Sequence, residues 1–225
     1  MTKRGRQRSK SAKAYKRTKT NILAPQRSLP LKPETTLTLK YSSVQRLNSA
    51  ITNTAENVYS ANSLYDPDVT NVGHQPMLFD QMAAMYLRYK VTHSRIWVYA
   101  QNMGLIVGSS RPTMVSIVVN DSATAISSDD MAYETPFTWS AMTSPPEGGM
   151  SVAKVATPWI DVAKFKGWRM SRDQDYAALV TASPLIQLYY HVYADRVEGS
   201  TVDVQTRVFI EYKVLFYDPK QVAES

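Results

Sequence analysis

Alternating apolar and polar positions predict that the chain is built mainly from β-strands. The longest such run is Thr201–Tyr217, in which apolar residues fall on one face and polar residues on the other. The apolar face consists of Val202, Val204, Val208, Ile210, Tyr212, Val214 and Phe216. The polar face consists of Asp203, Gln205, Arg207, Glu211 and Lys213, with Phe209 and Leu215 as exceptions to the pattern. The run therefore predicts a long strand that is buried on one side only, and Pro219 ends it.

Further stretches carry the composition of strands, which brings the expected total to seven to nine. They are Thr35–Tyr41, Val58–Ala61, Tyr89–Ala100, Pro112–Asn120, Phe137–Met142 and Leu185–Ala194. Within Tyr89–Ala100 the apolar residues change parity near Ser94–Arg95, which predicts a β-bulge or a change of neighbour. Leu185–Ala194 is apolar on both faces and is expected to be buried on both sides, in the protein or at an interface. Residues 152–168 show no clear pattern.

Two short segments have helical character. Phe79, Met82, Ala83 and Tyr86 recur at the spacing of one helix face, which predicts a helix over Phe79–Tyr86. Ser127–Tyr133 reads as a helical turn capped by Ser or Asp. Strands joined by long loops, with so little helix, predict an all-β sandwich or barrel, and the irregular loops fit a jelly roll better than a tight meander. The loops Val69–Pro76, Ala100–Arg111 and Ser144–Met150 are expected to lie at contacts between copies or on an exterior surface.

Charge divides the chain into two parts. The first 32 residues hold eleven basic side chains and no acidic one, whereas the whole chain has 26 basic and 19 acidic residues. The remainder therefore has 15 basic against 19 acidic residues and is mildly acidic. Prolines at 25, 30 and 33 mark the junction. We expect residues 1–34 to be a disordered basic arm and residues 35–225 to be a single folded domain.

A basic N-terminal arm is typical of proteins that bind nucleic acid. Each Lys or Arg that neutralises a phosphate releases a counterion, so binding is sensitive to salt and nearly blind to sequence. Tyr15 could stack on an unpaired base. The expected nucleic-acid-binding residues are Lys3, Arg4, Arg6, Arg8, Lys10, Lys13, Tyr15, Lys16, Arg17, Lys19 and Arg27.

The same arm has other readings. A nuclear import signal is expected as a second use of Lys3, Arg4, Arg6, Arg8, Lys10, Lys13, Lys16, Arg17 and Lys19. A solubilising tail, a membrane-surface tail or a mitochondrial transit peptide would also be basic, but no amphipathic apolar face accompanies these charges. No secretory signal and no apolar run near 18 residues is found, so we expect no membrane insertion.

The residues give no sign of catalysis, of a cofactor or of a metal site. The chain has no cysteine, and His74, His93 and His191 do not share metal-ligand spacing. His93 and His191 lie in predicted strands and are expected to be structural. The aspartate pairs at 66 and 68, 129 and 130, and 173 and 175 could hold Ca²⁺ but more often cap turns. Trp168-Arg169-Met170 and Tyr189-Tyr190 have the composition of subunit interfaces.

Two segments resemble a known family. Gln75–Gln81, followed by Met85-Tyr86, Tyr89-Lys90-Val91 and Ser94-Arg95-Ile96, is similar to the P-x-x-FDQ…Y…Y-x-V…S-x-I run in capsid proteins of circular, Rep-encoding single-stranded DNA viruses (circovirus-like). Phe209–Phe216 resembles their last strand. The resemblance implies an eight-stranded viral jelly roll of two four-stranded antiparallel sheets. It also implies an icosahedral T=1 shell of about 60 copies, an inward arm on a single-stranded DNA genome, and use of the host nuclear import machinery.

Alternatives stay open at this stage. Capsid proteins of small single-stranded RNA viruses share the implied fold, and an RNA cargo is not excluded. A non-viral nucleic-acid-binding protein, such as a ribosomal or chromatin component, would normally carry a basic patch on its body as well. An enzyme with a basic targeting tail would need a catalytic constellation, which the sequence does not provide. The host-cell attachment factor is unknown. The expected localisation is the virion, and the host nucleus during assembly.

Overall fold

The protein is an all-β sandwich of two antiparallel sheets with six and four strands. The computed structural model describes residues 31–49, 54–103, 112–143, 152–165, 174–196 and 202–220. These residues belong to one compact unit, Leu31–Ser225. The fold class expected from the sequence is confirmed. No helix among the described residues has the length and apolar character that crossing a membrane requires.

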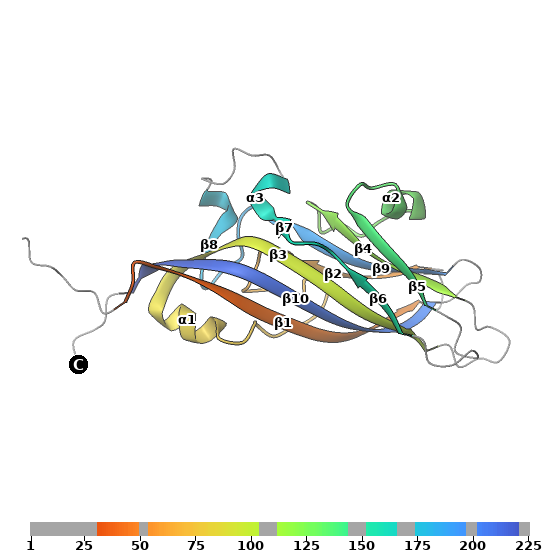
Figure 1. Cartoon of the computed structure of the whole chain (residues 1–225), viewed down its shortest axis with the longest axis horizontal. Coiled ribbons are helices and arrows are strands. Elements are labelled where there is room, and N and C mark those ends of the chain that lie inside the picture. Colours follow the sequence, from red (N-terminus) through yellow and green to blue (C-terminus); the bar gives the residue numbers. More distant parts are fainter. Residues whose placement is uncertain are drawn as a thin grey trace, which may run out of the picture. The chain divides into compact units, whose positions relative to one another are not determined.

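The larger sheet is built around the two longest strands. Its order is β1 (Glu34–Ser49), β10 (Val202–Pro219), β3 (Tyr86–Asn102) and β6 (Val152–Ala156). The short strands β7 (Ile160–Asp161) and β8 (Ala177–Leu179) pair with β3 beyond the end of β6. β1 and β3 therefore flank β10 along most of its length, as Figure 1 shows.

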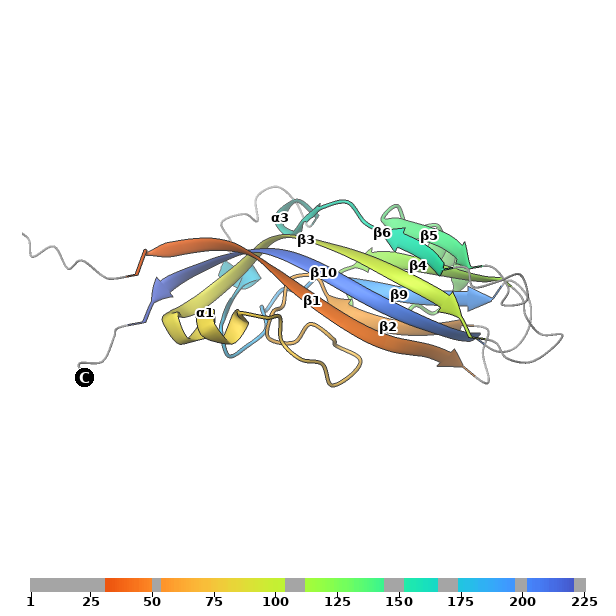
Figure 2. The same cartoon turned by 60° about the horizontal axis from the view of Figure 1, so that its bottom comes forward.

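The smaller sheet faces the larger one. Its order is β2 (Thr54–Ser60), β9 (Tyr189–Arg196), β4 (Thr113–Asn120) and β5 (Thr138–Thr143). The chain passes from one sheet to the other six times, from β1 to β2, β2 to β3, β3 to β4, β5 to β6, β8 to β9 and β9 to β10. Most neighbours in a sheet are therefore distant in sequence (Figure 2). This strand order is that of the eight-stranded jelly roll, with β7 and β8 as short additions to one edge.

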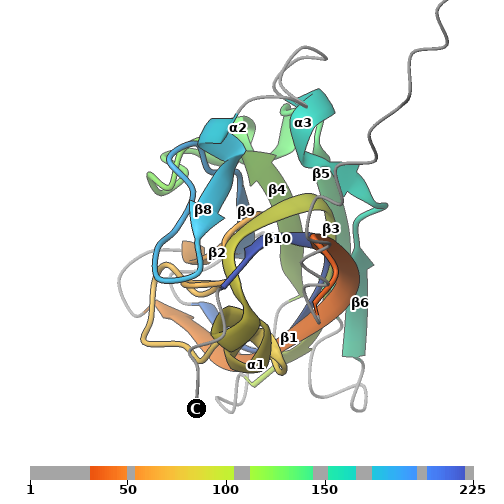
Figure 3. The same cartoon turned by 90° about the vertical axis from the view of Figure 1, so that its left-hand side faces the viewer.

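The core lies between the two sheets, which Figure 3 shows nearly end-on. Tyrosines contribute much of its volume, and two of them join the layers through their hydroxyl groups. Tyr212 donates to the carbonyl of Ser60 at 2.9 Å, and Tyr190 bonds the Ser94 hydroxyl at 2.8 Å. The alternation predicted for the last strand is confirmed, because its apolar positions from Val202 to Phe216 are buried.

The bulge expected in β3 is present, two residues before the predicted place. His93 pairs with Lys213 and Val91 pairs with Val214, so Thr92 is the extra residue. Tyr89 and Val91 face the core before the bulge, and even-numbered residues from 94 to 102 face it afterwards. The bulge thus converts a change of parity in the sequence into one continuous buried face.

Several predicted strands differ in extent from the observed ones. The expected Val58–Ala61 corresponds to the end of β2, which starts at Thr54, and the expected Tyr89–Ala100 is extended at both ends in β3. The first predicted strand was expected to end at Tyr41, but β1 continues through the mainly polar residues 42–49, because β10 pairs with it along its whole length. Leu185–Ala194 was expected as one strand, but β9 starts at Tyr189. Its burial on both faces is confirmed: the outer face is covered by residues 121–137, with Val118 and Tyr193 packed against Ala132.

Both predicted helical segments are confirmed. Helix α1 (Phe79–Met85) buries Phe79 and Met82 and leads directly into β3. Helix α2 (Asp129–Tyr133) is capped by Ser128, whose hydroxyl accepts from the backbone N–H of Met131. The sequence did not predict helix α3 (Val162–Phe165) or the 3-10 turn η3 (Gln174–Tyr176).

Candidate nucleic-acid and assembly surfaces

The basic residues expected to bind nucleic acid and to act in nuclear import lie outside the described residues. These are Lys3, Arg4, Arg6, Arg8, Lys10, Lys13, Tyr15, Lys16, Arg17, Lys19 and Arg27. Their roles, and the boundary between residues 34 and 35, stay predictions.

One cluster of charges lies on the outer face of the six-stranded sheet. Glu211 is almost buried, with 8 % of its side chain exposed, and binds two cations. Lys40 lies 3.0 Å from one carboxylate oxygen, and Arg95 binds the other through Nε at 2.7 Å and Nη2 at 2.6 Å. Burial alone would raise the pKa of Glu211, but the hydrogen bonds from Lys40 and Arg95 outweigh it and lower that pKa. The cluster therefore holds a carboxylate and an excess of positive charge.

Aromatic side chains lie beside these charges on the same face. The Arg95 guanidinium is 4.6 Å from the ring centroid of Trp159 and 5.7 Å from that of Trp97. Trp97 stacks on Phe209 with 5.5 Å between ring centroids and an interplanar angle of 14°. The alternation in the sequence placed Arg207, Glu211 and Lys213 on the polar face of the last strand, and it treated Phe209 as an exception. It gave no signal that Trp97 would meet Phe209, because their proximity depends on the register of β3 against β10.

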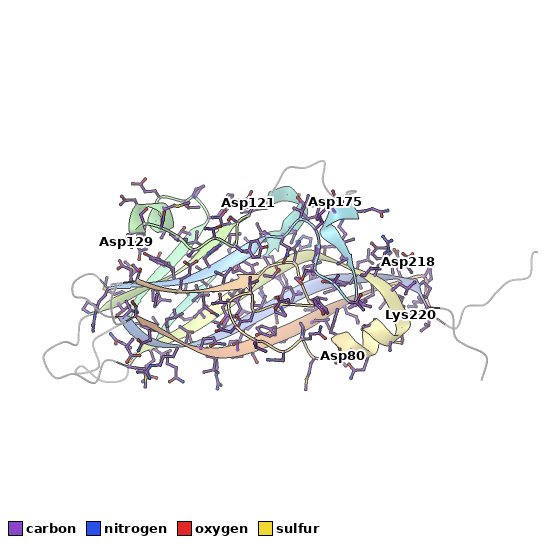
Figure 4. The ribbon with its side chains drawn as sticks, turned by 180° about the vertical axis from the view of Figure 1, so that it is seen from behind. Asp80, Asp121, Asp129, Asp175, Asp218 and Lys220 are labelled. Atoms are coloured by element: carbon purple, nitrogen blue, oxygen red, sulfur yellow. The ribbon has the colours of Figure 1, made fainter. Side chains whose placement is uncertain are left out.

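The outer face of the four-stranded sheet has the opposite charge. Residues 112–143 hold four acidic residues and no basic one, and the segment 121–137 covers β4 and β9. Figure 4 labels Asp129 beside α2 and Asp121 at the end of β4, both on the far side from β1. Asp121, Asp130 and Glu134 are exposed, whereas Asp129 accepts a hydrogen bond from Tyr193. We refer to residues 121–137 as the acidic cover.

A buried histidine fixes the acidic cover to the sheet. His191 in β9 is fully buried, its Nδ1 bonds the Glu56 carboxylate, and its Nε2 bonds the carbonyl of Ser122 at 2.8 Å. The second oxygen of Glu56 accepts from the backbone N–H of Ile126 at 2.9 Å. His191 is thus a structural histidine within a strand, as expected.

The other histidines are placed differently. His93 in β3 is partly exposed, and its Nε2 lies 3.7 Å from Asp161. His74 packs on Tyr41 with 4.8 Å between ring centroids. Among the described residues, no group of three or more His, Cys, Asp or Glu side chains is arranged to hold a metal ion.

The aspartate pairs have local structural partners. Asp68 is buried and accepts hydrogen bonds from Gln45, Asn57 and the backbone N–H of Asn71. Burial raises its pKa, and burial together with the charge of Asp68 raises the pKa of Asp66. The carbonyl of Asp175 accepts from Ile186, and Asp173 lies outside the described residues.

The expected interface residues and loops are only partly described. Tyr190 is fully buried in the core, so its assignment to an interface was wrong, because its ring points between the sheets toward Ser94. Tyr189 is partly buried. Val69–Pro76 is a loop whose first six residues are exposed, whereas residues 100–102 belong to β3. Trp168-Arg169-Met170, residues 104–111 and the loop Ser144–Met150 lie outside the described residues.

No protein-family model matches the chain, and neither does any curated protein. Among solved structures, the chain is similar to viral capsid structures. Mud crab tombus-like virus has 11 % identity over 87 % of this chain and 95 % of that one, with a TM-score of 0.46. The 60-mer of the BFDV capsid protein has 11 % identity over 85 % of this chain and 98 % of that one, with a TM-score of 0.45. Tobacco necrosis virus has 14 % identity over 85 % of each chain, with a TM-score of 0.42. At these identities and TM-scores, the similarity assigns no function to this chain.

Proposed function

We propose that the chain is the capsid protein of a small icosahedral virus, that it self-assembles into a shell, and that it packages a single-stranded DNA genome through its basic N-terminal arm. The observation that carries this proposal is the segregation of charge: eleven basic side chains precede a jelly-roll body whose acidic residues outnumber its basic ones. A fold alone does not specify a function. The proposal therefore rests on the fold together with the basic arm and the circovirus-like run at residues 75–96.

The physical mechanism is neutralisation of genome charge. Many arms in one shell would offset phosphate charge and release counterions, with little dependence on base sequence. The body would supply rigid units that contact one another around rotation axes. This role is structural rather than catalytic, and it needs no cofactor.

The same proposal includes the geometry of the shell, the route of nuclear import and the location of the protein. The shell is a T=1 assembly of about 60 copies, which contains the smallest set of equivalent subunits in icosahedral symmetry. The arm also serves as a nuclear import signal through its first nine basic residues, from Lys3 to Lys19, so that assembly takes place in the host nucleus. The mature protein resides in the virion.

An RNA cargo is the second candidate. Counterion release is nearly the same for both kinds of single strand, so the basic arm does not favour one of them. The resemblance of Gln75–Gln81 and Ser94–Ile96 to circovirus-like capsids favours DNA. Nuclease digestion of the nucleic acid recovered from purified particles, with DNase in one sample and RNase in another, distinguishes the two.

The test of the proposal compares the full chain with a variant that lacks residues 1–30. The full chain is expected to form particles of megadalton mass that contain nucleic acid. The deletion variant is expected to form empty particles, and its affinity for oligonucleotides should fall by at least tenfold at 0.15 M salt, because most of the basic charge is removed. Mass photometry measures the particle mass, the absorbance ratio at 260 and 280 nm measures the nucleic-acid content, and anisotropy titrations measure the affinity.

Two results would overturn the proposal. A full chain that stays at tens of kilodaltons under all ionic conditions would not be a shell protein. A deletion variant that packages as much nucleic acid as the full chain, with the same salt dependence, would show that the arm does not bind the genome.

A further inference from the structure

We infer that the outer face of the six-stranded sheet is a second surface for single-stranded nucleic acid, separate from the N-terminal arm. It has a row of stacked aromatic rings between two groups of cations. We call it the basic–aromatic face, and it consists of Lys40, Arg95, Trp97, Tyr99, Lys154, Trp159, Arg207, Phe209 and Lys213.

The register of the strands fixes this arrangement. Phe209 lies opposite Trp97, so two rings stack at the centre of the face. Two residues before Phe209 in β10, Arg207 lies opposite Tyr99 of β3. Tyr99 lies in turn opposite Lys154 of β6. Two residues after Phe209 in β10, Glu211 lies between Lys40 of β1 and Arg95 of β3. Neighbouring rows are about 6.8 Å apart, which is close to the phosphate repeat of an extended single strand.

The charge of the face suits a polyanion. The basic–aromatic face has five basic side chains, Lys40, Arg95, Lys154, Arg207 and Lys213, and Glu211 is the carboxylate among them. Lys40, Lys154 and Arg207 are exposed. Nζ of Lys213 lies 4.3 Å from the ring centroid of Trp159, and Nζ of Lys154 lies 5.5 Å from that of Tyr99. Cations held beside ring faces can contact phosphates while bases stack on the same rings.

Two hollows adjoin the central rings. One has a volume of about 340 Å³ and is lined by Arg95, Trp97, Tyr99 and Lys154, among others. The other has a volume of about 630 Å³ and is lined by Lys40, Phe209 and the side chains of His74, Met77 and Leu78. Both offer aromatic or apolar walls beside a cation. The bases of a single strand are free to enter such hollows, whereas those of a duplex are paired and stacked.

The inference does not require that the chain forms a shell. It concerns residues of the folded body, and it differs from the role of the arm, which contains no tryptophan. Tryptophan fluorescence therefore reports on the face and not on the arm. The full-length chain with Trp139→Phe and Trp168→Phe retains Trp97 and Trp159, which are both on the face.

The experiment titrates this full-length protein with a 15-nucleotide oligothymidylate and follows both tryptophan quenching and the anisotropy of a label on the oligonucleotide. We expect saturable quenching that is weaker with a duplex of the same length. Lys154→Gln with Lys213→Gln should raise the Kd of the quenching phase about tenfold and reduce its salt slope by about 1.4, as expected for two lost phosphate contacts. Phe209→Leu should also weaken this phase about tenfold, because a stacking ring is lost.

The matched control is Arg88→Gln with Lys164→Gln, which removes the same charge from two exposed ion pairs at the start of β3 and in α3, outside the nine residues of the basic–aromatic face. It should leave the quenching phase unchanged within twofold, and thermal melts should show that all variants are folded. Binding by anisotropy without any quenching would overturn the inference, since only the arm would then bind. Variants of the face that bind normally but no longer associate would also overturn it, since the face would then be a contact between copies of the chain.

Discussion

Asp68 and Gly73 form a tightly packed contact between the loop after β2 and the strand β1. Asp68 is buried, and hydrogen bonds from Gln45, Asn57 and Asn71 stabilise its carboxylate. Gly73 lies against it so closely that a Cβ atom at this position would be 2.9 Å from Asp68 Cβ and 2.9 Å from the Tyr41 hydroxyl oxygen. Neither neighbour is free to move, because one is held by hydrogen bonds and the other is in the core.

Gly73→Ala is therefore expected to lower the free energy of unfolding by about 1–3 kcal/mol, the usual cost of an atom added to a packed site. The measurement is urea denaturation followed by circular dichroism. Val72→Ala is the control, because Val72 is fully exposed one residue away, and its effect should stay within about 0.5 kcal/mol. Equal stability of Gly73→Ala and the wild type would contradict the packing described for this loop.

Glu211 shows how one carboxylate organises the charges of a sheet face. Its folded-state pKa is below the usual 4.5, because the hydrogen bonds from Lys40 and Arg95 exceed the effect of burial. The ionised carboxylate therefore contributes stability above the pKa of the unfolded state. That contribution is lost as the pH falls through the lower folded-state pKa.

Glu211→Gln should lower the free energy of unfolding by about 1.5–3 kcal/mol at pH 7, the range for hydrogen bonds to a charged group. The difference from wild type should shrink as the pH falls from about 4.5, the pKa of the unfolded state, through the lower folded-state pKa of Glu211. Denaturation curves at several pH values measure it. Asp203→Asn, which breaks the more exposed pair with Arg46, serves as the control and should cost less than about 1 kcal/mol. A difference that stays constant from pH 7 to pH 3 would argue against this role of Glu211.

At the scale of elements, the bulge at Thr92 determines which side chains of β3 enter the core. Tyr89 and Val91 face inward just before it, and residues after it face inward at even positions. Thr92 also donates from its hydroxyl group to the carbonyl of Lys213 at 3.2 Å. Without the extra residue, one half of β3 would present its apolar side chains to solvent.

Deletion of Thr92 is expected to abolish cooperative unfolding, because either Tyr89 and Val91 or Ile96 and Val98 would leave the core. Thr92→Ala keeps the bulge and loses one hydrogen bond, so its cost should be about 1 kcal/mol. Near-ultraviolet circular dichroism and urea denaturation distinguish the two variants. A deletion variant that melts like the wild type would show that β3 can shift its register without loss.

The bulge also shows what the sequence could and could not predict. The change of parity in Tyr89–Ala100 predicted it within two residues, because side-chain alternation is a local signal. The full length of β1 was missed, since its polar half is a strand only through pairing with β10, which is far away in sequence. The same limit applies to the basic–aromatic face. Arg207 and Lys213 were assigned to an outer face, but their proximity to Trp97, Trp159 and Lys154 depends on the pairing of three strands.

At the scale of the whole folded body, positive and negative charge lie on opposite faces of the sandwich. The sequence predicted a mildly acidic body, with 15 basic against 19 acidic residues outside the arm. The structure instead separates the charges, with the acidic cover over the four-stranded sheet and the basic–aromatic face on the six-stranded one. The folded body thus has a small net charge although two of its surfaces carry charges of opposite sign. The location of a charge should therefore matter more than the net charge when a polyanion binds.

This leads to a prediction about neutralising variants. Asp121→Asn, Asp130→Asn and Glu134→Gln together remove three negative charges from the acidic cover, which is separated from the basic–aromatic face by two sheets about 10 Å apart. That distance exceeds the Debye length of about 8 Å at 0.15 M salt, so the affinity for oligothymidylate should change less than twofold. Asp203→Asn removes one charge but frees Arg46, whose Nε is 2.6 Å from the Asp203 carboxylate on the outer face of the six-stranded sheet. Its effect on affinity should be larger, about threefold, since one more cation becomes available to phosphate. Anisotropy titrations at 0.15 M salt compare the affinities of the two variants. A larger gain in affinity from the triple variant than from Asp203→Asn would show that binding depends on the net charge of the body rather than on this face.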